Sequence, residues 1–245
     1  MLNTHNRRER LKAILIAAVV LAVVFAAVTL PIYKRNIERG ENVERTFRTV
    51  VVEYNNFIRI SNNMQLFCIV FLLLATRLPL SFSPVFLLRR RSRLSAINAD
   101  VWSLLLFAAE FAAVLEGIHL AGTTLLFGTA LPSQYGFYLF SAADFFAEWL
   151  FFFRLGLLLL LANVFMKKTF APFAALAVCL LLYYAADRVS VLYFPFYDAV
   201  VLPYLMAGVT KMSELPLAYL RSLVADGVLA AVVVWLFRRK DVLTV

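Results

Sequence analysis

The feature that most constrains the fold is a series of six long apolar stretches separated by more polar segments. They cover about residues 13–32, 64–88, 101–125, 141–165, 170–189 and 217–237. A helix needs roughly twenty apolar residues to cross the hydrocarbon of a bilayer, and backbone in hydrocarbon must satisfy its own hydrogen bonds. The sequence therefore predicts an all-α, polytopic membrane protein, with six transmembrane helices in a single domain over residues 1–245.

Positive charge gathers at alternate ends of these stretches. The clusters are 7–12 (RRERLK), 89–93 (RRRSR), 166–168 (MKK) and 238–240 (RRK). If the chain crosses the membrane six times, all four clusters lie on one face, and positive charge marks the cytoplasmic face of membrane proteins. We therefore expect both termini to be cytoplasmic.

Composition supports a membrane class and argues against nucleic-acid binding. Hydrophobic residues make up 63% of the chain, and the mean hydropathy is +0.83. A soluble domain needs a larger charged fraction than 16% to cover its surface. The net charge of +9 lies largely beside the apolar stretches, so we expect no nucleic-acid partner. Cys68 and Cys179 both lie inside apolar stretches, and we expect neither a disulfide nor a metal site from them.

Two segments between the apolar stretches have features of their own. Residues 33–63 hold six Lys or Arg and four Glu, and we expect a polar outer segment with a short helix near 47–60. Residues 190–216 are aromatic and apolar but contain three prolines. This segment is too interrupted for an ordinary span and too apolar for a solvated loop, so we expect a re-entrant helical hairpin between helices 5 and 6 that dips into the outer leaflet.

Charged residues accompany the expected hairpin. We expect them to anchor it at the level of the lipid headgroups, and a role in an outer gate is the alternative. They are Asp187, Arg188, Asp198, Lys211 and Glu214.

The usual catalytic and nucleotide-binding motifs are missing from the sequence. The spacing nearest to a phosphate-binding loop, Gly117 to Gly122, is followed by Thr123 where that loop has Lys. We interpret these glycines as helix-packing residues. His119 is interpreted as a packed polar residue, since His5, the chain's other histidine, lies near the N-terminus. No cofactor is expected on this chain.

Ionisable residues inside the apolar stretches are the sharpest candidates for a site. Charge in hydrocarbon costs about 2.5–3.5 kcal/mol per residue even on a lenient scale, so such residues seek a partner or water. At 1.5 Å per residue, four of them lie roughly 14–17 Å from the inner face. They are Arg77, Glu110, Arg154 and Asp226. We predict a buried interhelical network of these four, which either locks the bundle or lines a substrate path.

The basic segment from Arg89 to Asp100 is the candidate docking site on the inner face. It lies between two predicted spans and is long enough for one or two helical turns along the membrane surface. Its cations are Arg89, Arg90, Arg91 and Arg93. An alternative role for these cations is to set the topology and to contact anionic lipid.

This layout resembles the ABC-2 type family of transporter permeases. Members of that family have six spans with both termini inside, a short cytoplasmic coupling helix between spans 2 and 3, and a broken re-entrant pair between spans 5 and 6. Here the corresponding segments are Arg89–Asp100 and Ser190–Pro216. The ending Val234–Val242 (VWLFRRKDV) is similar to the usual finish of the family, an apolar helix closed by a basic cluster and Asp.

The resemblance implies a permease subunit of an ATP-binding cassette transporter in a bacterial or archaeal cell membrane. Two permease subunits, identical or different, would enclose the path for an exported amphipathic substrate such as a peptide, a drug or a lipid. A separate ATPase subunit would bind ATP and push on the inner loops, so this chain would not itself be an enzyme. The alternative is a non-transporting scaffold subunit of a larger membrane complex.

Overall fold

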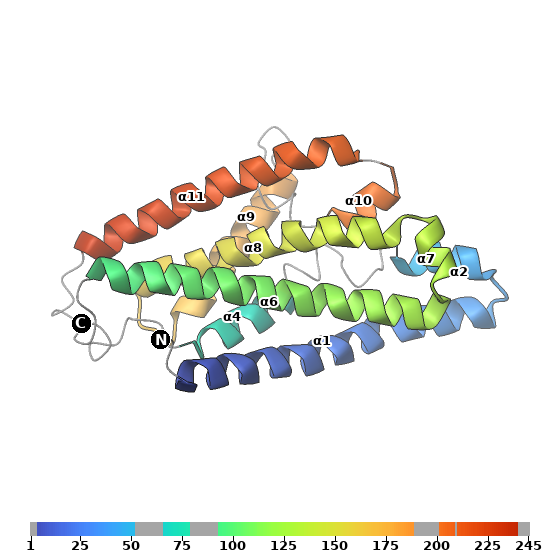
Figure 1. Ribbon diagram of the computed structural model, residues 1–245, viewed down its shortest axis with the longest axis horizontal. Helices are drawn as coiled ribbons and strands as arrows, with labels where there is room; N and C mark the ends of the chain where they lie inside the picture. The colour runs from blue at the N-terminus through green and yellow to red at the C-terminus, as the bar shows by residue number, and fades with distance from the viewer. Residues whose placement is uncertain (1–3, 52–65, 79–92, 189–200, 209, 240–245) are drawn as a thin grey trace.

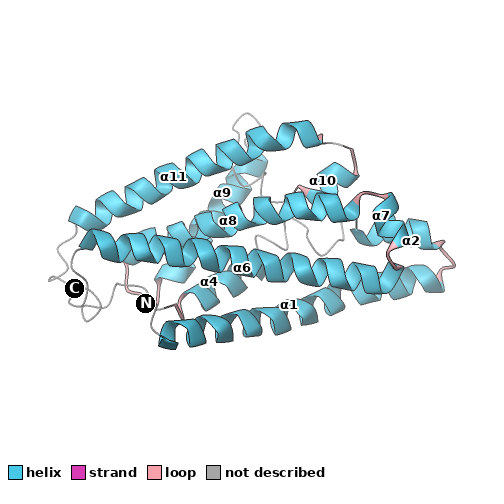
Figure 2. Cartoon of the chain, viewed as in Figure 1, coloured by secondary structure: helices cyan, strands magenta, loops and turns pink. Residues whose placement is uncertain are grey.

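The computed structural model describes residues 4–51, 66–78, 93–188, 201–208 and 210–239. Every regular element in these ranges is a helix, and the same ranges contain no strand (Figure 2). The helices are α1 (Thr4–Glu38), α2 (Val43–Val51), α4 (Cys68–Ala75), α6 (Arg93–Phe127), α7 (Ala130–Gln134), α8 (Phe137–Phe165), α9 (Ala171–Arg188), α10 (Leu202–Met206), the 3₁₀ helix η3 (Met212–Glu214) and α11 (Leu215–Arg239). The all-α prediction is confirmed for the described part of the chain.

Four of these helices are long and apolar enough to cross a membrane. They comprise residues Arg8–Glu38, Leu94–Phe127, Phe137–Phe165 and Met212–Arg239. These helices indicate an integral membrane protein. The other two predicted spans correspond to the short α4 and to the 18-residue α9, whose apolar part is Ala171–Leu182. Six crossings therefore remain a prediction.

The segments between the predicted spans differ in part from expectation. Residues 93–100 form the first turns of α6 and not a loop, because no helix breaker separates Arg93 from Val101 and because Ala96 and Ile97 are buried. Arg89, Arg90 and Arg91 lie outside the described residues. Within the predicted hairpin, the structure describes α10 and η3, while residues 190–200 lie outside the described part.

The long helices run in two directions, α1 and α6 one way and α8 and α11 the other, so the ends of these four helices that carry basic residues lie at one end of the bundle (Figure 1). The starts of α1 and α6 lie at the same end as the finishes of α8 and α11, while α2, α7 and α10 lie at the other (Figure 1). Basic residues lie near each of these ends, at Arg10, Arg93, Lys167 and Arg239. The bundle therefore has a basic end, as the charge pattern predicts. The side of the membrane that this end faces stays a prediction.

Helix α8 is the central element of the bundle. It contacts α4, α6, α9, α10 and α11. Every residue from Leu150 to Leu157 is buried, and a helix that is apolar all round is one that other helices surround. Trp149 fixes the register against α6, because its indole Nε1 donates to the Leu105 carbonyl oxygen at 3.0 Å.

Aromatic rings fill the interior of the bundle. Phe152 of α8 packs on Phe111 of α6 and Phe71 of α4, with ring centroids 4.7 and 5.2 Å apart. All three side chains are 0% exposed. Nearby, Cys68 of α4 and Cys179 of α9 are both buried, with their sulfurs 4.0 Å apart. A single copy of the chain therefore has a closely packed core where these rings meet.

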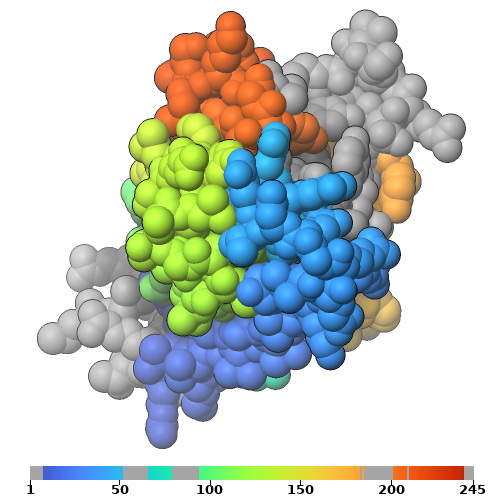
Figure 3. Space-filling model, turned by 90° about the vertical axis from the view of Figure 1, so that its right-hand side faces the viewer, coloured from blue at the N-terminus to red at the C-terminus, as the bar shows by residue number. Residues whose placement is uncertain are grey.

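A second, smaller aromatic cluster closes the end of the bundle opposite the basic end. Phe47 of α2 is fully buried against Phe127, Tyr135 and Phe137. Figure 3 looks onto this end and shows α2 in light blue against the yellow-green residues that join α6 to α8. The Tyr135 hydroxyl donates to Glu44 of α2, and this hydrogen bond raises the pKa of the phenol. Helix α2 is therefore held by both aromatic packing and a polar contact.

Close approach of α1 to α6 depends on Gly122. A Cβ atom at this position would overlap the ring of Phe25, and small residues at such contacts let membrane helices pack closely. We expect Gly122→Ala to lower the free energy of unfolding by about 1–3 kcal/mol through overpacking. Unfolding in mixed micelles followed by circular dichroism measures this change.

Gly117 provides the matched control on the same helix. A Cβ at Gly117 meets nothing within 4 Å, so Gly117→Ala should be neutral or stabilising by up to about 1 kcal/mol. The double variant Gly122→Ala/Phe25→Ala should lose less than the sum of its single variants. Additive losses would contradict the proposed contact.

Candidate functional site

Two of the four predicted network residues form an ion pair between α8 and α11. Arg154 Nε donates to Asp226 Oδ1 at 2.6 Å, and Arg154 Nη2 donates to the Ser222 carbonyl oxygen at 3.3 Å. The side chains of Arg154 and Asp226 are only 7% and 3% exposed. This pair links two long helices inside the bundle, where an unpaired charge would be costly.

The other two predicted residues lie elsewhere. Glu110 of α6 accepts two hydrogen bonds from Arg10 of α1, one of them from Nε at 2.6 Å. Arg10 lies at the basic end of the chain's first helix and was not a candidate in the sequence. Arg77 is exposed, and the ion pairs between described residues do not include it. The structure therefore contains two separate pairs in place of a four-residue network.

The remaining candidates are only partly described. Lys211 and Glu214 are exposed, and the Lys211 backbone N–H donates to Glu214 Oε2 at 3.5 Å. Asp187 and Arg188 end α9. Asp198 lies outside the described residues. The roles predicted for these residues, and for the basic segment at Arg93, stay predictions.

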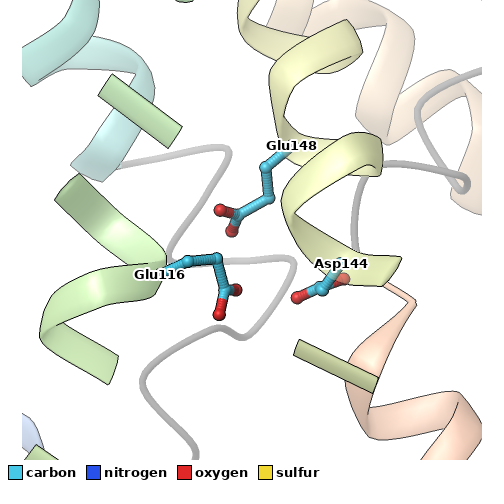
Figure 4. Close-up of side chains that lie close together, drawn as sticks. All are labelled: Glu116, Asp144 and Glu148. Atoms are coloured by element: carbon cyan, nitrogen blue, oxygen red, sulfur yellow. The ribbon is translucent and has the colours of Figure 1, made fainter. Parts of the chain in front are cut away.

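A cluster of three buried carboxylates lies between α6 and α8. Glu116 projects from α6, and Asp144 and Glu148 project from α8 toward it (Figure 4). One oxygen from each residue lies within 4.8 Å of the others. Their exposed fractions are 3%, 0% and 0%. Asp144 and Glu148 are the most deeply buried acidic residues in the described part of the chain.

Other polar groups surround this carboxylate cluster. Ser141 lies next to Glu116 and is fully buried, and His119 Nδ1 lies 3.9 Å from Glu116 Oε2. Asp144 Oδ1 accepts the backbone N–H groups of Val201 and Leu202 at 2.5 and 3.0 Å. Asp144 therefore also fastens the start of α10 to α8.

Helix geometry explains why the carboxylate cluster and the ion pair are separate. On α8, Glu148 and Arg154 are six residues apart, which turns the side chain by about 120° around the axis. Glu148 thus faces α6, while Arg154 faces α11. On α6, Glu110 and Glu116 have the same separation, and they face α1 and α8 in turn.

Sequence reasoning missed the carboxylate cluster as a site. His119 was interpreted as a packed polar residue, and Glu116, Asp144 and Glu148 were not among the candidates for a site. The available signal was helical spacing: Ser141, Asp144 and Glu148 follow the i, i+3, i+7 pattern of one helix face. What the sequence lacked was the pairing of α8 with α6, which brings Glu116 opposite this face.

Chemically, the carboxylate cluster has features of a cation or proton site. Carboxylate oxygens are the ligands that Mg²⁺, Ca²⁺ and Mn²⁺ prefer, and buried like charges can also share protons. The four long apolar helices indicate an integral membrane protein, and its apolar core contains a few buried charged groups. A comparison with protein-family models, curated proteins and solved structures finds no match for this chain.

Proposed function

We propose that the chain is the membrane-spanning permease subunit of an ABC-2 type transporter. In this proposal it moves an amphipathic substrate with energy from a separate ATPase subunit. The observation that carries the proposal is that α6 begins at Arg93, well before the predicted span. Residues 93–100 extend the predicted span at 101–125 without a break, at the end of the bundle where the basic residues gather.

The length of α6 supports contact with a soluble partner. Its 35 residues make a helix about 52 Å long, whereas the hydrocarbon core of a bilayer is about 30 Å thick. Ser95 and Asn98 are exposed on the extension, while Ala96 and Ile97 are buried. A partner that pushes on this extension would move the same helix that carries Glu110 and Glu116.

The solid aromatic core favours a path between two copies and not through one. Phe71, Phe107, Phe111 and Phe152 fill the bundle interior. The face of α11 presents exposed apolar side chains at Leu217, Leu220, Val224 and Val228. The same core also favours the second candidate, a membrane scaffold that binds partners without transport.

Charge reversal on the basic segment tests the permease proposal. We expect Arg89→Glu/Arg90→Glu/Arg91→Glu to reduce co-purification of an ATPase in mild detergent by about tenfold or more, since charge complementarity steers docking. Insertion and helicity should not change. Mass spectrometry of the eluate and ATP turnover in proteoliposomes with an amphipathic dye provide the measurements.

A matched control lies at the opposite end of the bundle. Arg45 and Arg48 on α2 are exposed, and reversing both should leave ATPase recovery unchanged. If the parent retains an ATPase but moves no amphiphile, the scaffold is the better description. If the basic-segment variant retains full ATPase coupling, this segment is not the docking site.

A further inference from the structure

We propose that Glu116, Asp144 and Glu148 bind a divalent cation of the oxygen-preferring class, Ca²⁺ or Mn²⁺. This site is separate from the proposed docking segment. Glu116 lies about 16 Å from the end of α6 at Phe127, and the docking segment lies at the other end of that helix. It does not depend on an ATPase or on a second copy. Its argument rests on geometry, on unsatisfied buried oxygens and on charge.

The spacing of the three carboxylates suits a single ion. Their ligand oxygens lie within 4.8 Å of one another, so the point at their centre is at most about 2.8 Å from each oxygen, close to the roughly 2.3–2.6 Å of Ca²⁺–oxygen bonds. One ion at the centre could therefore contact all three oxygens at once. Figure 4 shows that the carboxylates converge on the space between α6 and α8.

Several oxygens at this point have no donor. Both oxygens of Glu116 and Oδ2 of Asp144 are buried without a hydrogen-bond partner among the described residues. Ser141 is 0% exposed and its Oγ also lacks a hydrogen bond within the described part of the chain, although it lies beside Glu116. Buried polar atoms in native proteins are nearly always satisfied, so this group of oxygens points to a ligand.

Charge leads to the same inference. Among the described residues, no Lys or Arg forms an ion pair with Glu116 or Asp144. Arg154, on the same helix as Asp144, pairs with Asp226. Buried carboxylates at such short range repel one another strongly. A divalent cation would offset this repulsion. The carboxylate oxygens and the Ser141 hydroxyl would replace water molecules in its coordination shell.

Such an ion would hold three elements together. Glu116 belongs to α6, Asp144 and Glu148 belong to α8, and the other oxygen of Asp144 holds the start of α10. Binding to the folded state alone raises its stability. We expect the melting temperature of the chain to rise by roughly 5–10 °C when Ca²⁺ or Mn²⁺ exceeds its dissociation constant about a hundredfold.

The test uses the full chain in nanodiscs after treatment with a chelator. Metal analysis should find one Mn²⁺ or Ca²⁺ per chain after reloading, and Mn²⁺ paramagnetic resonance should show the bound ion. Glu116→Gln and Glu148→Gln keep the side-chain shape and should lose both the signal and the thermal shift. Glu110→Gln changes another α6 carboxylate, which pairs with Arg10, and should keep both.

A second readout separates metal binding from a purely structural role. In chelator, Glu116→Gln should melt at the same temperature as the parent or higher, because it removes one repelling charge. A large loss of stability of Glu116→Gln in chelator, or no bound metal in the parent, would overturn the proposal. So would a parent whose melting temperature responds to acid but to none of the metals, since the carboxylates then share protons. None of these three results bears on ATPase docking.

Discussion

Replacing Arg154 by Met is expected to lower the free energy of unfolding by about 3–5 kcal/mol. The substitution leaves the Asp226 side chain, which is 3% exposed, without its cationic partner, and removing one member of a buried ion pair has a cost of this size. It also removes the donor to the Ser222 carbonyl oxygen on α11. Equilibrium unfolding in mixed micelles, followed by circular dichroism, measures the loss.

The double variant distinguishes charge burial from packing. Arg154→Met/Asp226→Leu removes both charges, so it should recover most of the stability that the single variant loses. Glu110→Gln breaks the more exposed pair with Arg10, whose side chains are 23% and 39% exposed, and should cost no more than about 1 kcal/mol. Equal losses in the single and double variants would show that the pair contributes mainly through its shape.

Truncation of Phe152 should produce the second large effect. Phe152→Ala removes the ring that contacts Phe71, Phe111 and Phe151 and leaves a cavity. Phe→Ala changes in cores cost about 3–5 kcal/mol. We expect a value near 3 kcal/mol, because packing and not transfer from water drives helix association in lipid.

The control for this change is an exposed phenylalanine. Phe173 on α9 is 64% exposed, so Phe173→Ala should change the stability by no more than about 0.5 kcal/mol. Thermal aggregation of the detergent-solubilised protein gives an independent ranking of the two variants. A loss at Phe173 as large as that at Phe152 would place the packed core on the other face of α9.

The long helices could be predicted from the sequence because hydrocarbon imposes a simple rule of length and polarity. The predicted spans at 101–125, 141–165 and 217–237 each fall inside a longer observed helix. The ends were less predictable, because a helix leaves the membrane and continues while its residues permit. Residues 33–38 and 93–100 both continue a helix past the apolar stretch.

The candidate site was less accessible from the sequence. Depth alone suggested that Arg154 and Asp226 lie at one level, and the structure joins them. Depth could not assign Glu110, because its partner Arg10 lies at the end of α1, outside the apolar stretch. The carboxylate cluster depends on which faces of α6 and α8 meet, and this is a property of packing that no single helix encodes.

The adjacent thiols of Cys68 and Cys179 have a practical consequence. They are the two cysteines of the chain and belong to α4 and α9, which lie far apart in sequence. Because their sulfurs are 4.0 Å apart and both residues are fully buried, a short thiol-specific crosslinker should join these helices, without any engineered residue, only when the core opens enough to admit it. The protein thus contains its own proximity reporter. A change in crosslinking yield during turnover would reveal movement between α4 and α9.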